Sequence, residues 1–321
     1  MPPTCTICKR RDAIYTRLYS GEKMCTKCFC LSIENKVRAT ISKYNMLSFD
    51  DEVAVGVSGG KDSMALLHVL AKLEKSFPRT KLGAIIVDEG ICGYRDEALK
   101  IAKKGCQKLA VEHVVVSFEE VFGHKLDELV ERLQDEKVDS RGLTPCAYCG
   151  VLRRRALNSA ARDWGATKLA TAHNLDDETQ TILLNMLHGD PLRIVRIQPV
   201  SPPTDSRFVS RIKPFCEILE KETTLYAYLK RIEFQSIPCP YASTALRSDA
   251  RAILNRMEEK HPGLKYGFYR SVEKLRFSFE RTNEVKKIES CKVCGEPTVG
   301  DVCQVCVMLR RLKPQKRRGK L

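Results

Sequence analysis

The chain has 321 residues, of which 43% are hydrophobic, and its formal net charge at pH 7 is +15. This length and apolar content predict one sizeable core with small attached modules, or two domains. No apolar run is long enough for a membrane span and the first residues lack the apolar stretch of a secretory signal, so we expect a soluble, cytoplasmic protein without a membrane partner. The charge favours a polyanionic partner, nucleic acid before acidic lipid.

The first thirty residues are rich in cysteine. Two C-x2-C pairs stand sixteen residues apart, at Cys5, Cys8, Cys25 and Cys28. Two intervening residues let one turn direct both thiolates at one ion, and four thiolates close a tetrahedral shell around zinc. An iron site or unligated thiols are the alternatives, and Cys30 is a spare thiol beside the set. We expect a structural zinc module over residues 1–30, since a segment this short cannot build its own core.

The next segments alternate between helical and strand patterns. Residues 32–47 have apolar residues at helical spacing, with Ser32 as a possible N-cap. Four near-continuous apolar runs follow as predicted strands, at residues 53–57, 84–87, 113–117 and 168–172. Segments of helical length separate these runs. This alternation predicts an α/β fold, in which a parallel sheet is covered by helices on both faces.

The stretch SGGKDS, residues 58–63, follows the first predicted strand and precedes a helix. Its spacing does not fit a Walker A loop. It nonetheless contains the parts of an anion site, because glycines admit backbone N–H groups, two serines and a lysine add polar groups, and a helix N-terminus follows. A tight strand-to-helix turn without a ligand is the alternative.

A further cysteine pair has a different character. Cys146 and Cys149 lie in TPCAYCG, and the isolated thiols that follow are Cys216 and Cys239. A pair with one distant cysteine leaves a coordination position open, which suits a persulfide or disulfide relay or an iron–sulfur cluster held by three thiolates. A third structural zinc site completed by Cys216, or packed thiols, is the alternative. We expect the remaining thiols, Cys92 and Cys106, to be structural.

The C-terminal third is basic. Residues 198–211 read as a Pro-rich loop, residues 218–234 have helical spacing, and residues 245–285 combine Arg and Lys with Tyr and Phe in a helical pattern. A second set of two C-x2-C pairs, at Cys291, Cys294, Cys303 and Cys306, predicts a second zinc module over residues 288–308. Residues 31–287 would form the catalytic domain and residues 309–321 a basic tail that contacts phosphates or only aids solubility.

Several stretches together resemble a known family. SGGKDS resembles the pyrophosphate loop of the Rossmann-like PP-loop ATP pyrophosphatases, which cut ATP between its α and β phosphates to adenylate a substrate. VDEGICGYRDEAL (87–99), PCAYCGVLRRRALN (145–158) and TAHNLDDETQTILLNMLHGD (171–190), with a cysteine module at each end, are similar to the TtuA group of tRNA 2-thiolation enzymes, and especially to its cytoplasmic wobble-uridine branch.

The resemblance implies a role for particular residues. The ATP phosphates would be bound by Ser58, Gly59, Gly60, Lys61, Asp62 and Ser63, with Val87 and Asp88 bordering the adenosine. Cys146, Cys149 and Cys239 would hold a [4Fe-4S] cluster. Asp176 or Asp177 and Arg153 would aid catalysis, although Arg153, in contrast to a Lys at this position, cannot transfer a proton. Mg²⁺ on the two aspartates and a nucleotide-orienting His173 complete the expected site.

The implied reaction is adenylation of the uridine C2 oxygen followed by its replacement with sulfur. Position 34 of tRNA Lys, Glu and Gln is the expected target, and position 54 in the T loop is the alternative. Sulfide, a persulfide or a ubiquitin-like thiocarboxylate protein would supply the sulfur, and the group suggests a homodimer or a heteromer with a related subunit. Two other functions are alternatives. An adenylating enzyme that forms lysidine or an amide would not need the set of Cys146, Cys149 and Cys239. A non-catalytic zinc-bearing RNA-binding protein would not need an intact SGGKDS loop.

Overall fold

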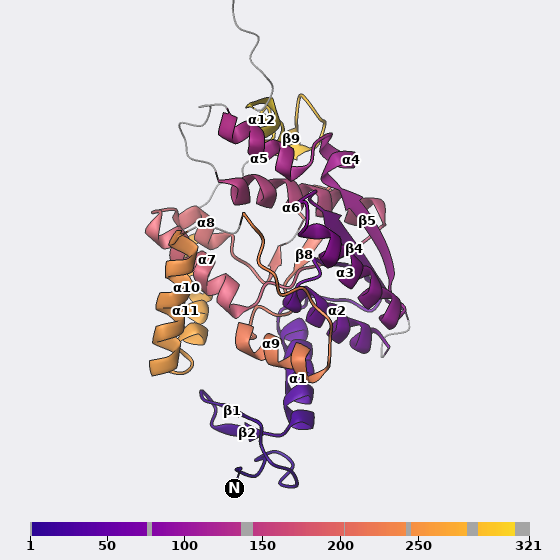
Figure 1. The fold of residues 1–321 in the computed structure, drawn as a ribbon. Coiled ribbons are helices and arrows are strands. Elements are labelled where there is room, and N and C mark those ends of the chain that lie inside the picture. Colours follow the sequence, from indigo (N-terminus) through magenta and orange to yellow (C-terminus); the bar gives the residue numbers. More distant parts are fainter. Residues whose placement is uncertain are drawn as a thin grey trace, which may run out of the picture.

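A computed structural model describes residues 2–75, 79–135, 144–201, 203–241, 245–280 and 288–311 (Figure 1). The helices in this part of the chain are α1 (Thr26–Lys43), α2 (Lys61–Glu74), α3 (Arg95–Leu109), α4 (Phe118–Phe122), α5 (Leu126–Asp135), α6 (Pro145–Asp163), α7 (Leu175–Leu187), α8 (Pro191–Val195), α9 (Glu220–Leu229), α10 (Ala245–Lys260), α11 (Leu264–Glu280) and α12 (Gln304–Arg311). The strands are β1 (Tyr15–Arg17), β2 (Glu22–Met24), β3 (Glu52–Gly56), β4 (Lys81–Asp88), β5 (Glu112–Ser117), β6 (Lys168–Ala170), β7 (Val200–Ser201), β8 (Ser210–Ile212), β9 (Glu289–Ser290) and β10 (Pro297–Thr298).

The central sheet has the strand order β5-β4-β3-β6-β8-β7. Every neighbouring pair is parallel except the edge pair of β7 and β8, which is antiparallel. The four strands predicted from apolar runs are β3, β4, β5 and β6. The predicted α/β fold with a mainly parallel sheet is therefore confirmed.

Helices cover both faces of this sheet. Val55 and Ile86 point into the apolar core that includes α2, α1 and α9. Their chain neighbours Ala54 and Ile85 point the other way, into the core formed with α6. This alternation is why strands buried on both faces read as continuous apolar runs.

The strand order places two loops together. β3 lies between β4 and β6 in the sheet. From β3, the chain first adds β4 and β5 on one side and then adds β6 on the other side. In parallel sheets, ligands bind outside the carboxyl ends of the strands where the order reverses in this way. The segments after β3 and after β6, which begin at Val57 and Thr171, therefore border the expected ligand site.

Two sequence predictions were wrong in detail. The first long helix begins at Thr26, not at Ser32, because the second cysteine pair of the N-terminal module lies at the start of the helix; the Ser32 hydroxyl donates to Phe29 O inside the helix. The segment 198–211 is not only a loop, because it contains β7 and the start of β8. β8 is held there by its parallel pairing with β6.

The C-terminal elements follow the predicted pattern more closely. The basic segment 245–285 contains α10 and α11, and its residues 281–285 lie outside the described part of the chain. α12 continues to Arg311, and the remainder of the expected tail lies outside the described residues. None of the helices in the described ranges is long and apolar enough to cross a membrane. The β1–β2 and β9–α12 modules lie at opposite ends of the molecule in Figure 1.

Candidate active site

The SGGKDS segment forms a tight connection between β3 and α2. Gly59 has φ +85°, and a Cβ there would lie 2.5 Å from Ala98 O, so only glycine fits without a backbone shift. Ser58 Oγ lies 3.0 Å from Ser63 Oγ and 3.3 Å from Gly60 N, which braces the turn. Gly60 precedes α2 with no side-chain cap. The first amides of α2 are therefore available to an anion.

Lys61 stands at the start of α2 between two carboxylates. Its Nζ lies 2.5 Å from Asp62 Oδ2 and 2.8 Å from Glu220 Oε1 of α9. Burial alone would lower the pKa of Lys61, but the two carboxylates raise it above its ordinary value. The lysine is thus held cationic beside the helix N-terminus.

A third carboxylate, Asp177, lies near the two that pair with this lysine. Asn174 caps α7 in a reciprocal box with Asp177, and Asn174 Nδ2 donates to Asp62 Oδ1 at 3.3 Å. Burial, with Asp62 and Glu220 nearby, raises the pKa of Asp177 to about 6. Asp62, Asp177 and Glu220 therefore face one another where oxygen ligands for Mg²⁺ are expected.

Asp176 has a different environment from Asp177. Its Oδ1 pairs with Lys265 of α11, and its Oδ2 accepts from Glu220 N at 2.7 Å. The residue is 5% exposed. Both oxygens are thus occupied in tying α7 to α9 and α11, and Asp177 is the aspartate of this pair that faces the loop.

His173 follows β6 at the same edge. Its Nδ1 lies 3.0 Å from Thr171 Oγ1. Its side chain is exposed to solvent on one side. Desolvation by the surrounding protein has the largest effect on its pKa, the positive charges of Lys213 and Arg211 add to it, and together they lower the pKa to about 3. His173 is therefore neutral at physiological pH and able to accept or donate one hydrogen bond.

The end of β4 is held against the loop. Arg95 donates to Ser58 O at 2.8 Å and to Val87 O at 2.5 Å. Asp88 Oδ1 accepts from Gly90 N at 2.9 Å and so forms the turn after the strand. Val87 and Asp88 thus lie next to the glycine loop. These are the two residues that the family resemblance suggests as neighbours of the adenosine.

The third cysteine set belongs to the α6 side of the sheet. Thr144 caps α6, which places Cys146 and Cys149 one turn apart at its start. Cys149 is buried in the same apolar core against which Cys239 packs. Cys216 is buried in the core on the opposite face, so it does not complete this set.

Two of the three thiols have hydrogen-bond partners. Cys146 Sγ donates to Tyr241 O at 2.9 Å, and Arg153 Nη2 donates to Cys149 Sγ at 3.1 Å. Burial raises the pKa of Cys149 to about 11. Cys146 and Cys239 also raise this pKa, so both lie near Cys149. Two helical thiols one turn apart and a third from a loop fit a cluster with three cysteine ligands.

Glu89 joins this set to the glycine loop. Its Oε1 lies 2.6 Å from Arg153 Nε, and its Oε2 lies 2.7 Å from Arg95 Nε. The glutamate is 2% exposed and Arg95 is 3% exposed. One buried carboxylate therefore connects the arginine on Cys149 with the arginine on Ser58.

The two terminal modules each gather four thiols. In both sets the sulfur atoms lie within 4.8 Å of one another. The Cys8–Cys25 and Cys294–Cys303 sulfurs are 3.9 and 3.6 Å apart. A tetrahedral Zn²⁺ with bonds of about 2.3 Å requires sulfurs about 3.8 Å apart, so both sets fit the ion. Cys30 is buried in the apolar core outside the first set, and Cys106 is buried likewise.

The sequence did not single out four residues that the fold brings to the site: Glu89, Arg95, Glu220 and Lys265. Glu89 and Arg95 lie inside the stretch 87–99 that carries the resemblance, but no role was assigned to them, because their roles come from contacts that the fold makes. The position of Glu89 directly after a strand end could have indicated it. In α11, the Tyr266 hydroxyl accepts a hydrogen bond from Lys36 Nζ, and Tyr269 is 2% exposed.

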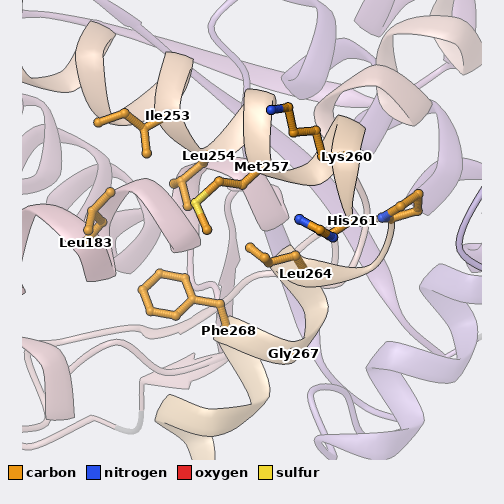
Figure 2. A pocket seen from close by; sticks show the side chains of 10 residues that line it. Leu183, Ile253, Leu254, Met257, Lys260, His261, Leu264, Gly267 and Phe268 are labelled. Atoms are coloured by element: carbon orange, nitrogen blue, oxygen red, sulfur yellow. The ribbon is translucent and has the colours of Figure 1, made fainter.

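A hollow of about 860 Å³ lies elsewhere in the described part of the chain, lined mainly by apolar side chains of α10 and α11, with Leu183 of α7. Figure 2 shows Ile253, Leu254 and Met257 facing Phe268 across it. None of the residues described above lines this hollow, so it is separate from the strand-end region.

Comparison with known proteins agrees with this arrangement. The PP-loop domain of the ATP_bind_3 family matches residues 31–254. The chain belongs to the PP-loop family. It is 36% identical to the tRNA 2-thiolation protein NcsA of Haloferax volcanii, over 94% of this chain and 97% of that one. It is 34% identical to the tRNA-5-methyluridine(54) 2-sulfurtransferase of Pyrococcus horikoshii, over 94% and 92%.

A solved structure is similar to this PP-loop protein throughout. The U34-tRNA thiolase NcsA from Methanococcus maripaludis, solved with its [4Fe-4S] cluster, superposes with a TM-score of 0.82. The two chains are 34% identical, and the match covers 96% of each. The resemblance to tRNA 2-thiolation enzymes predicted from the motifs is thereby confirmed.

Proposed function

We propose that this protein is an ATP-dependent tRNA 2-thiouridine synthetase of the cytoplasm. The observation that carries the proposal is the connection of Cys149 to Ser58 through Arg153, Glu89 and Arg95. It supports a sulfur-handling role for the cysteine set close to a loop that would bind pyrophosphate. The names of the similar proteins support the same reaction.

The chemistry requires two steps because the C2 oxygen of uracil is a poor leaving group. A lone pair of that oxygen forms a bond to the α-phosphorus of ATP, and the bond to the β-phosphate oxygen breaks to release pyrophosphate. A sulfur nucleophile then adds at C2, and the C2–O bond breaks with AMP as the leaving group. The site must therefore stabilise two anions that leave in turn.

The glycine loop would stabilise the pyrophosphate. The free amides at the start of α2 and the Lys61 ammonium both point to the place where its charge develops. Removal of one such donor in other enzymes costs about 3 kcal/mol of transition-state stabilisation. Ser58 and Ser63 would add hydroxyl contacts.

Asp62, Asp177 and Glu220 would hold Mg²⁺. Their carboxylates face one another beside Lys61, and carboxylate oxygen is the ligand that Mg²⁺ prefers. The bound ion would neutralise phosphate charge. Asp176 would instead position this set, through its contacts with Lys265 and Glu220 N.

Cys146, Cys149 and Cys239 would bind a [4Fe-4S] cluster, which supplies an iron with an open position for sulfur. Arg153 donates to Cys149 and would orient this thiolate while adding positive charge near the departing AMP. It remains protonated, because Glu89 raises its pKa further against the effect of burial. Arg153 thus acts by charge and not as a general acid. Zn²⁺ would occupy the two terminal modules.

We propose uridine 34 as the target, since the similar solved structure is a U34-tRNA thiolase. The Pyrococcus relative, which is named for position 54, is as similar in sequence, so U54 is the second candidate. Sulfide or a thiocarboxylate protein would donate the sulfur. The expected homodimer, or heteromer with a related subunit, stays a prediction, as do the domain boundaries.

The test is anaerobic incubation with ATP, sulfide and unmodified tRNA Lys, followed by nucleoside analysis. Transcripts with C at position 34 or at position 54 identify the target. We expect 2-thiouridine and AMP from the wild-type transcript and from the position-54 variant only. Thiolation of the position-34 variant instead would establish U54. Absence of both products would support the non-catalytic RNA-binding alternative.

A further inference from the structure

Arg154 differs from the arginines beside it. Arg153 pairs with Glu89, and Arg155 pairs with Glu296 of the C-terminal module. Arg154 has no hydrogen-bond acceptor or carboxylate partner within the described residues. Its Nη1 lies 3.5 Å from where a Cβ on Gly150 would stand, so the guanidinium turns back along α6 toward the cysteine pair.

A second arginine without a carboxylate partner lies on the facing strand. Arg211 of β8 is in register with Leu169, whose side chain belongs to the core under α6. Paired residues of parallel strands point to the same face, so Arg211 points toward α6. Its Nε is buried and has no hydrogen-bond partner in the part of the chain that the structure describes.

Asn158 brings the two arginines together. Its Oδ1 accepts from Val209 N at 3.0 Å, and its Nδ2 donates to Arg207 O at 2.9 Å. This fixes the approach to β8 against α6, one helical turn after Arg154. Burial has the largest effect on the pKa of Arg154, and the positive charge of Arg211 has the next largest; both lower this pKa. The second effect is the repulsion expected between two neighbouring guanidinium groups.

The surroundings do not neutralise this pair. The charged groups that act on the neighbouring His173 are Lys213, Arg211, Arg247 and Arg154, all of them cations. Glu178 is the carboxylate that acts on Arg211, and both of its oxygens bond Lys213 Nζ at 2.8 Å. Arg154 is exposed, whereas Arg211 is partly buried and its enclosed Nε lacks an acceptor in the described part of the chain. An enclosed guanidinium without a counter-charge is costly, so an anion that reaches it beside Arg154 would be stabilised.

We propose that Arg154 and Arg211 bind a phosphodiester of the RNA substrate beside the target nucleotide. Guanidinium groups bind phosphate oxygens through paired N–H donors. The ATP phosphates have their own donors at the start of α2, which covers the opposite face of the sheet from α6. The arginine pair instead lies on the face of Cys149, where an unstacked base must come to receive sulfur. This inference rests on the proposed function.

The test uses Arg154→Gln and Arg211→Gln, singly and combined, in the full chain. Arg38→Gln is the matched control, because Arg38 is an exposed arginine of α1 on the other side of the sheet. Dissociation constants for unmodified tRNA are measured without ATP over a series of salt concentrations. The KM for ATP and the melting temperature without ligand are measured alongside.

We expect the double variant to bind tRNA about 10-fold or more weakly, with a slope of log Kd against log salt smaller by about one. The control should bind as the wild type does. The KM for ATP should not change, and the melting temperature should stay equal or rise, since a repulsive pair has been removed. A reduction of Arg154→Gln binding with a fall in melting temperature would indicate a structural role and overturn the proposal.

Two other outcomes would also contradict it. Unchanged tRNA binding would exclude the phosphodiester contact, and a rise in the KM for ATP with unchanged tRNA binding would assign the arginines to a phosphate of the nucleotide. Because tRNA binding is measured without turnover, failure of thiolation by the wild-type protein would overturn the proposed function and leave this contact standing.

Discussion

Arg153 Nε lies 2.6 Å from Glu89 Oε1, and this ion pair joins the cysteine side of the molecule to the phosphate loop. Glu89 is buried and has a second partner in Arg95, which donates to the backbone of Ser58 and Val87. A change at the cysteine set can therefore reach the glycine loop through three side chains.

Glu89→Gln tests this connection. The amide keeps the shape but leaves Arg95 buried without a counter-charge, so we expect a loss of stability of about 3 kcal/mol. Thiolation should fall by about 10- to 100-fold, as for other residues that orient a site. Chemical denaturation and steady-state kinetics measure both. Glu233→Gln, at an exposed carboxylate paired with Lys104, is the control, and equal effects of the two changes would refute the connection.

Gly59→Ala tests the loop. The change places a Cβ at φ +85° and 2.5 Å from Ala98 O. Gly93→Ala is the matched control, because Gly93 has φ +69° with nothing within 4 Å of its Cβ. The control should lose about 1–2 kcal/mol of stability for its conformation alone, and Gly59→Ala about 1–3 kcal/mol more, with loss of ATP binding. Equal stability losses with retained ATP binding would show that the close approach to Ala98 is unimportant.

His173→Gln tests the cationic surroundings of this residue. The pKa of His173 is about 3 in the folded protein against an ordinary 6.5. Between these values the unfolded chain binds more protons, so the stabilising effect of the neutral ring is complete above pH 6.5 and is lost as the pH falls toward 3. The wild type should lose stability relative to His173→Gln between pH 7 and pH 5. Solvent access reduces the size of this difference, and parallel pH curves would exclude the shifted pKa.

Cys8→Ser tests the N-terminal module. Arg17 of β1 lies 2.7 Å from Glu222 of α9, and the same helix supplies Glu220 and Thr223 to Lys61 and Asp62. We expect one zinc ion fewer per chain and a several-fold rise in the KM for ATP. Cys294→Ser should also lose one zinc and leave this KM unchanged, since its module contacts α6 through Glu296. An unchanged KM in Cys8→Ser would show that the module does not position the loop.

The fold and the cysteine groups could be predicted from the sequence wherever a single short segment contains the whole motif. SGGKDS, the two four-cysteine modules and the apolar strands are each local, so their geometry follows from spacing. Tertiary pairing decided the rest. Ser32 lies inside a helix because the cysteine pair before it lies at the start of that helix, and the strands at 200–201 and 210–212 exist through pairing at the edge of the sheet.

The difference between Asp176 and Asp177 also depends on tertiary structure. Both lie within three residues of Asn174 in the sequence, but α11 supplies Lys265 to Asp176 alone. The chain places Lys265 eighty-nine residues from Asp176, so no local pattern indicates the pair. Glu89 and Glu220 were missed for the same reason, since a single carboxylate acquires its role only from the arginine or lysine that the fold brings to it.

The central claim is that three cysteines hold a cluster used for tRNA thiolation. Anaerobic purification with iron and sulfide analysis, followed by thiolation of tRNA with ATP and sulfide, tests it most directly for the wild type, Cys146→Ala and Cys239→Ala. We predict about four irons and four sulfides per wild-type chain. Both variants should lose iron and thiolation while keeping their zinc. Full iron and full thiolation in either variant would contradict the account.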